Sequence, residues 1–314
     1  MDKVLYLVVP CYNEEEVLRE TASRVKEKLM SLIKEGAVSG ESRVCFVNDG
    51  SKDKTWEIIT DLFHNGEYFA GVNLSRNRGH QNAILAGMMT AKTYADYIIT
   101  MDADLQDDIN ALDEMVGKAN EGADIVYGVR SARKTDTFFK RFTAEGFYKV
   151  MKLLGVDIVF NHADYRLMTK RVVNALEDYH EVNLFLRGII PLIGFKSDVV
   201  YYERAERFAG ESKYPLKKML SLAFDGVTSF SLKPLKLVSV FGGLSFLFGI
   251  AMLIYALYSY FSGISTNGWA SLMCAISILS GLNMFFMGIV GEYVGKIYLE
   301  TKQRPRYIVE EFLK

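Results

Sequence analysis

The chain has 314 residues, of which 50% are hydrophobic, and a formal net charge of −1. This length allows about two domains, and the near-neutral balance of charge argues against nucleic acid as a partner. The three cysteines, Cys11, Cys45 and Cys274, are odd in number and lack metal-ligand spacing. The sequence therefore indicates neither a disulfide framework nor a zinc site.

The first residues, Met1-Asp2-Lys3, lead directly into a strand pattern. They lack the long apolar core and the small-residue cleavage site of a signal peptide. We therefore expect the first domain to remain in the cytoplasm.

Strand and helix patterns then alternate along the chain. This alternation predicts a doubly wound, mainly parallel α/β sheet of the Rossmann-like type. The glycine-rich dinucleotide fingerprint is absent after the first strand, so we do not expect a nicotinamide cofactor. Strands are expected at residues 4–9, 43–48, 69–73, 97–101 and 124–129, and helices at residues 14–34, 54–63, 78–93 and 108–121.

The short apolar strand that begins at Tyr97 ends in two aspartates, Asp102 and Asp104. Side chains alternate along a strand, so both carboxylates point to one face at its carboxyl end, where open α/β sheets bind ligands. Two carboxylates repel each other unless a cation lies between them, which favours Mg²⁺ or Mn²⁺ bridging to a diphosphate. The alternative is a solvated acidic turn that precedes the helix near Asp108.

Two apolar segments follow the first domain. Residues 237–291 contain no Asp, Glu, Lys or Arg, and the block is interrupted only at residues 262–268. Residues 237–261 and 269–291 are each long enough to cross a hydrocarbon core of about 30 Å as a helix. A buried hairpin of a soluble domain would carry a polar stripe, which these segments lack. We therefore expect two transmembrane helices.

Basic residues flank this pair of helices, whereas the loop between them has no charge. The positive-inside rule then places both flanks, and both termini, in the cytoplasm, as in a multi-pass protein of the inner (cell) membrane. We divide the chain into a catalytic domain at residues 1–215, an amphipathic juxtamembrane helix at 216–234, and two spans with a cytoplasmic tail at 235–314. The flanking residues are Lys213, Lys217, Lys218, Lys233 and Lys236 on one side and Lys296, Lys302, Arg304 and Arg306 on the other.

Three motifs occur in order at strand ends: VVPCYNEE from Val8, VNDGSKDKT from Val47 and DADLQD from Asp102. Together they resemble the family-2 inverting glycosyltransferases with the GT-A fold. HADYRLM from His162 and RFAGESKY from Arg207 resemble the polyprenyl-phosphate group of that family, which includes bactoprenol glucosyltransferases and dolichol-phosphate mannose synthases. One departure is Asn48, where many members have a second aspartate.

The resemblance implies a reaction and a set of site residues. It implies that a UDP-sugar, with glucose favoured, gives one sugar to undecaprenyl phosphate for cell-envelope glycosylation, with Mg²⁺ or Mn²⁺ held by Asp102 and Asp104. Asp164 and Asp104 would be catalytic. The nucleotide sugar would be bound by Pro10, Tyr12, Glu14, Val47, Asp49, Asp102, Ala103, Gln106, Arg130, Arg207 and Lys213.

Several of these residues have alternative roles. Tyr12 could stack on uracil or pack at a turn, and Asp49 could accept a hydrogen bond from the base or cap the next turn. Arg130 could pair with phosphate through its planar guanidinium or form a surface ion pair. Arg207 and Lys213 could close over the leaving diphosphate as a mobile loop or remain solvated charges beside the membrane.

The family places a proposed catalytic base in the motif that contains Asp164. A lipid phosphate has a second pKa of about 6, so the acceptor is largely ionised near neutral pH and needs little deprotonation. Asp164 could therefore orient the acceptor, or bind metal or sugar hydroxyls, instead of taking a proton. It could also form an Asx-turn before the strand that follows.

Two amphipathic segments, residues 138–154 and 216–230, have basic neighbours and could lie at the headgroup level of a bilayer. The apolar face of the first could equally pack on the catalytic domain. Small residues in the apolar segments permit close helix packing, so a homo-oligomer, for example a tetramer, is plausible. They are Gly242, Gly243, Gly249, Gly281, Gly288, Gly291 and Gly295.

Two other functions share the first three motifs. A processive polysaccharide synthase is disfavoured because two spans are too few for a polymer channel and the Gln-x-x-Arg-Trp motif is absent. An inactive membrane-anchored binding protein is disfavoured because Asp49, Asp102, Asp104 and Asp164 are all present.

Overall fold

The computed structural model describes residues 2–131, 162–182, 184–203, 233–263 and 268–314. Its contacts divide the chain into two units. The first comprises Met1–Tyr148, Asp157–Pro215 and Gln303–Lys314, and the second comprises Lys149–Val156 and Leu216–Lys302. The first unit contains the sheet and the second contains the apolar helices.

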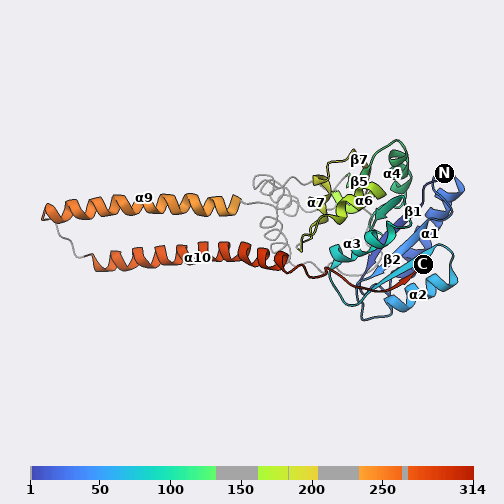
Figure 1. The fold of residues 1–314 in the computed structure, drawn as a ribbon, viewed down its shortest axis with the longest axis horizontal. Helices are drawn as coiled ribbons and strands as arrows, with labels where there is room; N and C mark the ends of the chain where they lie inside the picture. Colours follow the sequence, from blue (N-terminus) through green and yellow to red (C-terminus); the bar gives the residue numbers. More distant parts are fainter. Residues whose placement is uncertain (1, 132–161, 183, 204–232, 264–267) are drawn as a thin grey trace. The chain divides into compact units, whose positions relative to one another are not determined.

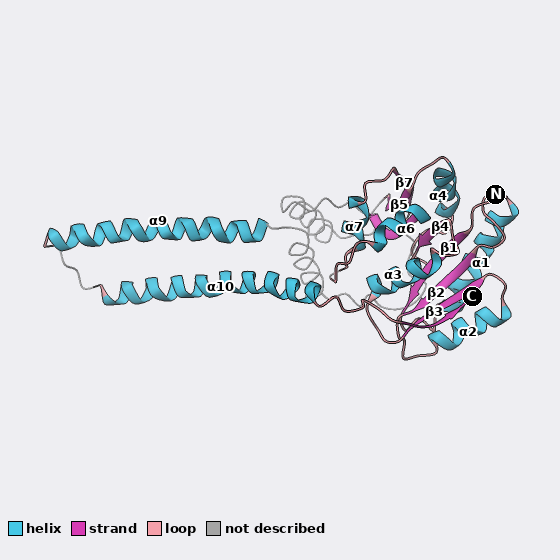
Figure 2. Ribbon diagram, in the orientation of Figure 1, coloured by secondary structure: helices cyan, strands magenta, loops and turns pink. Residues whose placement is uncertain are grey.

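The first unit is built on one eight-stranded sheet in the order β7-β5-β6-β4-β1-β2-β3-β8. Figure 2 shows the strands of this unit in magenta among its helices. Neighbouring strands are parallel except where β6 pairs with β4 and β5 and where β8 pairs with β3. The strands are β1 Leu5–Cys11, β2 Arg43–Asn48, β3 Phe69–Leu74, β4 Tyr97–Thr100, β5 Ile125–Arg130, β6 His162–Thr169, β7 Ser197–Tyr202 and β8 Val309–Leu313.

Helices cover both faces of this sheet (Figure 1). Alternate residues of β1, such as Leu7 and Val9, join one apolar core with α1, α2 and α4, while Val8 faces α3 on the other side. Burial on both faces explains why the central strands are almost continuously apolar. The helices are α1 Leu18–Lys34, α2 Thr55–Asn65, α3 His80–Ala91, α4 Ala111–Asn120, α6 Lys170–Glu177 and α7 Leu186–Leu192.

Strand β6 determines the position of Asp164. It is antiparallel to β4, with Thr100 opposite Arg166 and Tyr97 opposite Thr169. The amino end of β6 therefore lies at the carboxyl end of β4. This arrangement places Asp164 at the edge of the sheet where Asp102 follows β4.

The second unit contains two long apolar helices, α9 Lys233–Phe261 and α10 Trp269–Thr301. Large apolar side chains along both are exposed, including Phe246 at 70% and Met284 at 77%. Segments of both, Lys233–Ser259 and Ile278–Thr301, are long and apolar enough to cross a membrane. Continuous exposed apolar surface requires an apolar environment or a partner, so the pair is consistent with two transmembrane helices.

The expected strands and helices of the first domain are confirmed, with small shifts at their ends. Helix α1 begins at Leu18 instead of residue 14, and the residues before it form a turn in which the backbone amide of Val17 donates to the carbonyl of Glu14 (3.1 Å). The sequence did not predict β8: we expected the residues after the second span, which ends near residue 291, only as a cytoplasmic tail, whereas Gln303–Lys314 belong to the first unit and include this strand. The segments 138–154 and 216–230 lie outside the described residues.

The tight packing of α3 on the sheet depends on Gly87. A Cβ at this position would lie 2.6 Å from Val47 Cγ2 and closer still to Val8 Cγ1, both buried. We predict that Gly87→Ala lowers the free energy of unfolding of the first unit by about 1–3 kcal/mol through overpacking, as measured by chemical denaturation of the purified protein.

Gly117 provides the control, because it lies in α4 with open space around its Cβ position. Gly117→Ala should stabilise by about 0.5–1 kcal/mol through helix propensity. Equal effects of the two substitutions would contradict the packing explanation.

Candidate active site

The carboxyl edge of the parallel strands gathers most of the residues that the sequence singled out. Asp49 follows β2, Asp102 follows β4, and His80 begins α3 directly after the loop that leaves β3. Asp164, near the start of antiparallel β6, lies at the same edge. The side chains therefore come from four different strands or strand–helix connections, as is usual for ligand sites of open α/β sheets.

His80 lies between two of the predicted carboxylates. Its Nε2 is 3.4 Å from Asp102 Oδ1 and 3.6 Å from Asp164 Oδ2. Burial alone would lower the pKa of His80, but the contact with Asp164 and the negative charges of Asp102 and Asp164 outweigh it and raise the pKa. The imidazole thus connects the candidate metal ligand to the candidate catalytic carboxylate.

Asp164 is the centre of a cationic cluster. Its side chain is 5% exposed, and it pairs with Arg166, which is 1% exposed, on the same face of β6. Arg187, near the start of α7, contacts both carboxylate oxygens, with Nε 3.2 Å from Oδ1 and Nη2 2.9 Å from Oδ2. Gln81 Nε2 donates a further hydrogen bond to Oδ2 at 3.1 Å. One carboxylate therefore orders two guanidinium groups, an amide and an imidazole.

These partners keep Asp164 ionised. Burial would raise its pKa, but Arg187, His80 and Arg166 together hold the pKa well below the usual range of an aspartate. A carboxylate with such a low pKa is a weak proton acceptor. The arrangement suits a group that positions cations better than a group that removes a proton.

Asp102 and Asp104 fit a divalent cation. Among the described residues, the buried atom Asp102 Oδ1 accepts no hydrogen bond, although His80 Nε2 lies 3.4 Å from it. Burial and the charges of Asp107, Asp164 and Asp104 raise the pKa of Asp102 to about 6, against the lowering effect of His80. A bound cation would coordinate the unsatisfied oxygen of Asp102 and would reduce the repulsion between the neighbouring carboxylates.

The described residues hold no group of three or more His, Cys, Asp and Glu that could bind a metal. Two carboxylates that leave the remaining positions to water and phosphate oxygens are the usual protein contribution at Mg²⁺ sites. Asp102 and Asp104 match that pattern. Asp104 Oδ1 also accepts the backbone N–H of Gln106 at 3.2 Å, which orients this carboxylate.

The residues predicted to bind the nucleotide lie around the ends of β1 and β2. Pro10 and Val47 are buried neighbours in these two strands, while Tyr12 lies just beyond β1 with 41% of its surface exposed. Asp49 is buried and accepts hydrogen bonds from the backbone amides of Arg78 (2.7 Å) and Gly79 (2.9 Å). Asp49 therefore fastens the loop after β3 instead of capping its own turn.

The remaining predicted residues lie elsewhere on the edge or outside the described chain. Arg130 Nη2 is 3.2 Å from Asp107 Oδ1, and its Nε donates to the hydroxyl of Tyr202 (3.3 Å). Ala103 and Gln106 are buried in the loop after β4. Arg207 and Lys213 lie outside the described residues.

Four residues of the cluster were not predicted from the sequence. Arg166 could have been found, because it is two residues from Asp164 on a strand and shares its face. His80 and Gln81 follow β3 and could have been placed at the same edge by the rule used for Asp49. Arg187 carries no comparable signal, because it follows a long connection after β6 and is brought in only by the packing of α7.

Two family models match the sequence. Residues 6–176 match glycosyl transferase family 2, and residues 233–297 match the GtrB C-terminal hairpin. The first match covers all three motifs at the strand ends, and the second covers most of α9 and α10.

Full-length relatives agree with these matches. The uncharacterized glycosyltransferase YkoT of Bacillus subtilis (strain 168) is 50% identical, with 98% of this chain and 91% of the relative covered. The prophage bactoprenol glucosyl transferase homolog of Escherichia coli (strain K12) is 39% identical over 98% of this chain and 99% of its own. The bactoprenol glucosyl transferase of Shigella phage SfX is 39% identical over 97% and 98%. This chain therefore belongs to glycosyl transferase family 2 and carries the GtrB-type C-terminal hairpin.

Proposed function

We propose that the protein transfers a single hexose, with inversion, from a UDP-sugar to polyprenyl phosphate at the cytoplasmic face of the membrane. The relatives named bactoprenol glucosyl transferase are similar over the whole chain, including the apolar hairpin, which supports a lipid-linked acceptor and favours glucose. The observation that carries the proposal is the His80 imidazole, which lies between Asp102 and Asp164. This contact brings the candidate donor-diphosphate side of the site next to the candidate acceptor side.

In this reaction a phosphate oxygen of the acceptor attacks the anomeric carbon as the bond to the UDP oxygen breaks on the opposite face. Asp102 and Asp104 would hold Mg²⁺ or Mn²⁺, which neutralises charge on the leaving diphosphate when bound. Arg187 and His80, both ordered by Asp164, are suited to hold the acceptor phosphate. Because that phosphate is already anionic, catalysis here needs orientation and charge stabilisation more than proton removal.

Strand β8 bears on the membrane topology. Strand β8, which follows α10, joins the same sheet as the strands that precede α9, so these strands lie on one side of any bilayer that the two helices cross. This agrees with the basic residues on both flanks, which favour the cytoplasmic side.

A first prediction concerns the metal. Asp104→Asn removes charge without changing volume, so it should abolish sugar transfer while the thermal unfolding of the purified protein stays near that of the wild type. The assay is transfer of label from UDP-[¹⁴C]glucose to undecaprenyl phosphate with Mg²⁺ or Mn²⁺. Full activity of Asp104→Asn in the presence of EDTA would rule out a metal at Asp102 and Asp104.

A second prediction concerns the stability provided by Asp164. Asp164→Asn leaves Arg166 buried beside a neutral amide, which should cost about 3–5 kcal/mol near pH 7. Because the folded-state pKa of Asp164 is depressed, this stabilisation is present above the unfolded value of about 3.9 and disappears as pH falls through the folded value. The free energies of unfolding of the two proteins should therefore differ throughout pH 5–8, and the difference should grow on the acid side of this range as His80 becomes protonated beside Asp164 in the wild type. The difference should shrink only below about pH 3.9, as pH approaches the depressed folded value.

Asp113→Asn is the matched control, because Asp113 pairs with Lys28 at the surface and should change stability by less than about 1 kcal/mol. In single-turnover transfer, the folded fraction of Asp164→Asn should retain partial activity with weaker acceptor binding. A loss of more than about 10⁴-fold at every pH, with binding of both substrates unchanged, would instead assign Asp164 to the chemical step.

A third prediction concerns topology. A cysteine at Gly268, beside the start of α10, should react with a membrane-impermeant maleimide added to intact cells, whereas a cysteine at Lys302 should react only after lysis. The reverse pattern would overturn the orientation inferred from the basic flanks.

A further inference from the structure

We propose that the C-terminal strand β8 positions the donor-binding turn through its residue Glu310. This proposal rests on the proposed function for the identity of the donor, a nucleoside diphosphate sugar. The turn is Asp49-Gly50-Ser51, which follows β2. Its connection to β8 is a row of hydrogen-bonded side chains that crosses β3.

The row runs through two asparagines. Glu310 Oε2 accepts from Asn73 Nδ2 (3.3 Å), and Asn73 Oδ1 accepts from Asn48 Nδ2 (2.7 Å). Asn48 Oδ1 in turn accepts the backbone N–H of Ser51 (3.2 Å). Asn48 is buried and precedes Asp49 directly, so the row ends inside the turn.

The pairing register of β8 with β3 places Glu310 beside this row of side chains. Asn73 lies opposite Glu311 and Leu74 lies opposite Val309, so Glu310 is the additional residue at an irregularity in the pairing. Such bulges turn a side chain away from the regular alternation and are frequent beside active sites. The bulge explains how an exposed strand residue contacts a side chain of β3.

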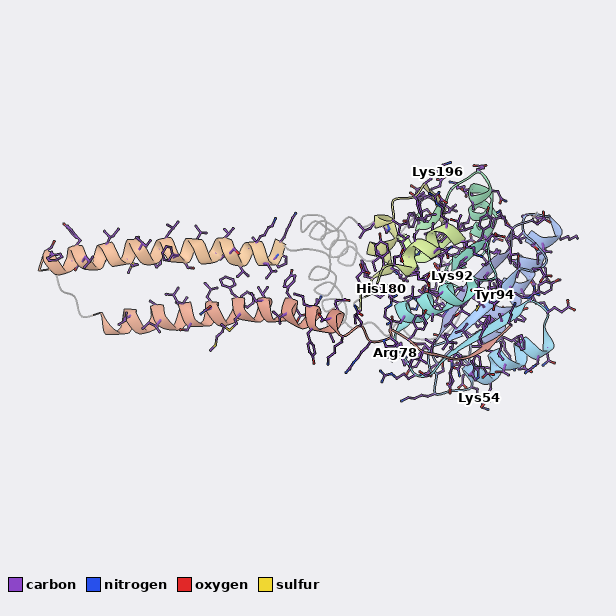
Figure 3. All side chains as sticks on the ribbon, in the orientation of Figure 1. Lys54, Arg78, Lys92, Tyr94, His180 and Lys196 are labelled. Atoms are coloured by element: carbon purple, nitrogen blue, oxygen red, sulfur yellow. The ribbon has the colours of Figure 1, made fainter. Side chains whose placement is uncertain are left out.

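The strand is held in place on both sides of Glu310. The backbone amide of Ser75 donates to the carbonyl of Ile308 (3.1 Å). Phe312 stacks on Tyr94 with 5.8 Å between ring centroids, and Lys314 Nζ lies 3.8 Å from the centroid of the same ring. Figure 3 labels Tyr94 on the catalytic unit. Glu310 is therefore part of an anchored strand.

The two ends of the row fix the orientation of both amides. A carboxylate can only accept a hydrogen bond and a backbone N–H can only donate one, so Asn73 must turn its NH₂ to Glu310 and Asn48 must turn its oxygen to Ser51. No other pair of amide orientations satisfies both ends. The charge of Glu310 thus selects the side-chain orientation that supports the turn.

The turn itself tolerates little rearrangement. Gly50 has φ +62°, and a Cβ there would collide with the backbone of Arg76 and Asn77. Asp49 holds the same loop through the amides of Arg78 and Gly79. A change in the orientation of Asn48 would therefore disturb both loops that border the predicted nucleotide site.

The test reverses the direction of the hydrogen bonds between residues 310, 73 and 48. In Asn48→Asp, residue 48 can still accept the Ser51 N–H but can no longer donate to Asn73. Asn73 would then have to face two carboxylates with one NH₂ group, and the turn would lose its connection to β8. Adding Glu310→Gln supplies a donor at the other end, and Asn73 can then turn around and satisfy both neighbours. Asn48→Asp combined with Glu311→Gln is the matched control, because it has the same net charge but leaves Glu310 in place.

Two measurements are made on the full-length protein in detergent. Titration calorimetry measures the binding of UDP in the presence of Mn²⁺. Steady-state kinetics measures the KM for the donor and kcat separately. Asn48→Asp should weaken UDP binding and raise donor KM about five- to tenfold, the effect of roughly one hydrogen bond, with kcat little changed. Adding Glu310→Gln should restore both values to within about twofold of the wild type, whereas adding Glu311→Gln should not.

Exchange of backbone amide hydrogens, measured without nucleotide, reports on the local stability of the turn independently of donor binding. Exchange at residues 49–51 should accelerate in Asn48→Asp and return to the wild-type rate only with Glu310→Gln. Equal behaviour of the two double variants would overturn the proposal. If the wild type binds no UDP while this exchange pattern holds, the proposed donor is wrong and the positioning role of Glu310 stands.

Discussion

The candidate site depends on a single buried carboxylate. Asp164 is 4% exposed and is surrounded by Arg166, Arg187, His80 and Gln81. A buried charge is tolerable only when partners compensate it, and removing one member of such a group costs more than the group contributes as a whole. Arg166 is almost fully buried and has the same requirement, so these side chains keep one another in place. The positions of His80 and Arg187 at the sheet edge follow from that mutual dependence.

This organisation has a chemical consequence. The same partners that make Asp164 acceptable in the interior also keep its pKa low, which makes it a weak proton acceptor. What remains is a fixed arrangement of cations beside two carboxylates, Asp102 and Asp104, whose mutual repulsion a divalent cation would relieve. For a reaction in which an anion displaces another anion, preorganised charge of both signs is the contribution that a protein can make.

The two antiparallel strands of the sheet contribute at opposite ends of the site. Strand β6 runs against β4 and brings Asp164 to the carboxyl edge beside Asp102. Strand β8 covers the edge of β3, where unpaired backbone groups would otherwise be exposed. Because β8 follows α10 in the chain, the first unit is completed only after both apolar helices have been made. The polypeptide therefore connects the hairpin of α9 and α10 to the first unit at both ends of the hairpin.

The sequence by itself determined the alternation of strands and helices, the two apolar helices and the carboxylates at strand ends, because each of these is encoded in local periodicity or in a short motif. It also placed Asp102, Asp104 and Asp49 at one edge, since all follow parallel strands. Only the tertiary structure decided that Arg187 contacts Asp164, that Asp49 fastens the loop after β3, and that residues 309–313 form a strand. These contacts join segments separated by tens to hundreds of residues, and their partners are chosen by burial and hydrogen bonding, which leave no period in the sequence. The short, charged C-terminal tail shows this most clearly. The segment VEEFL, residues 309–313, has little strand character by itself and forms a strand by pairing with the edge strand β3.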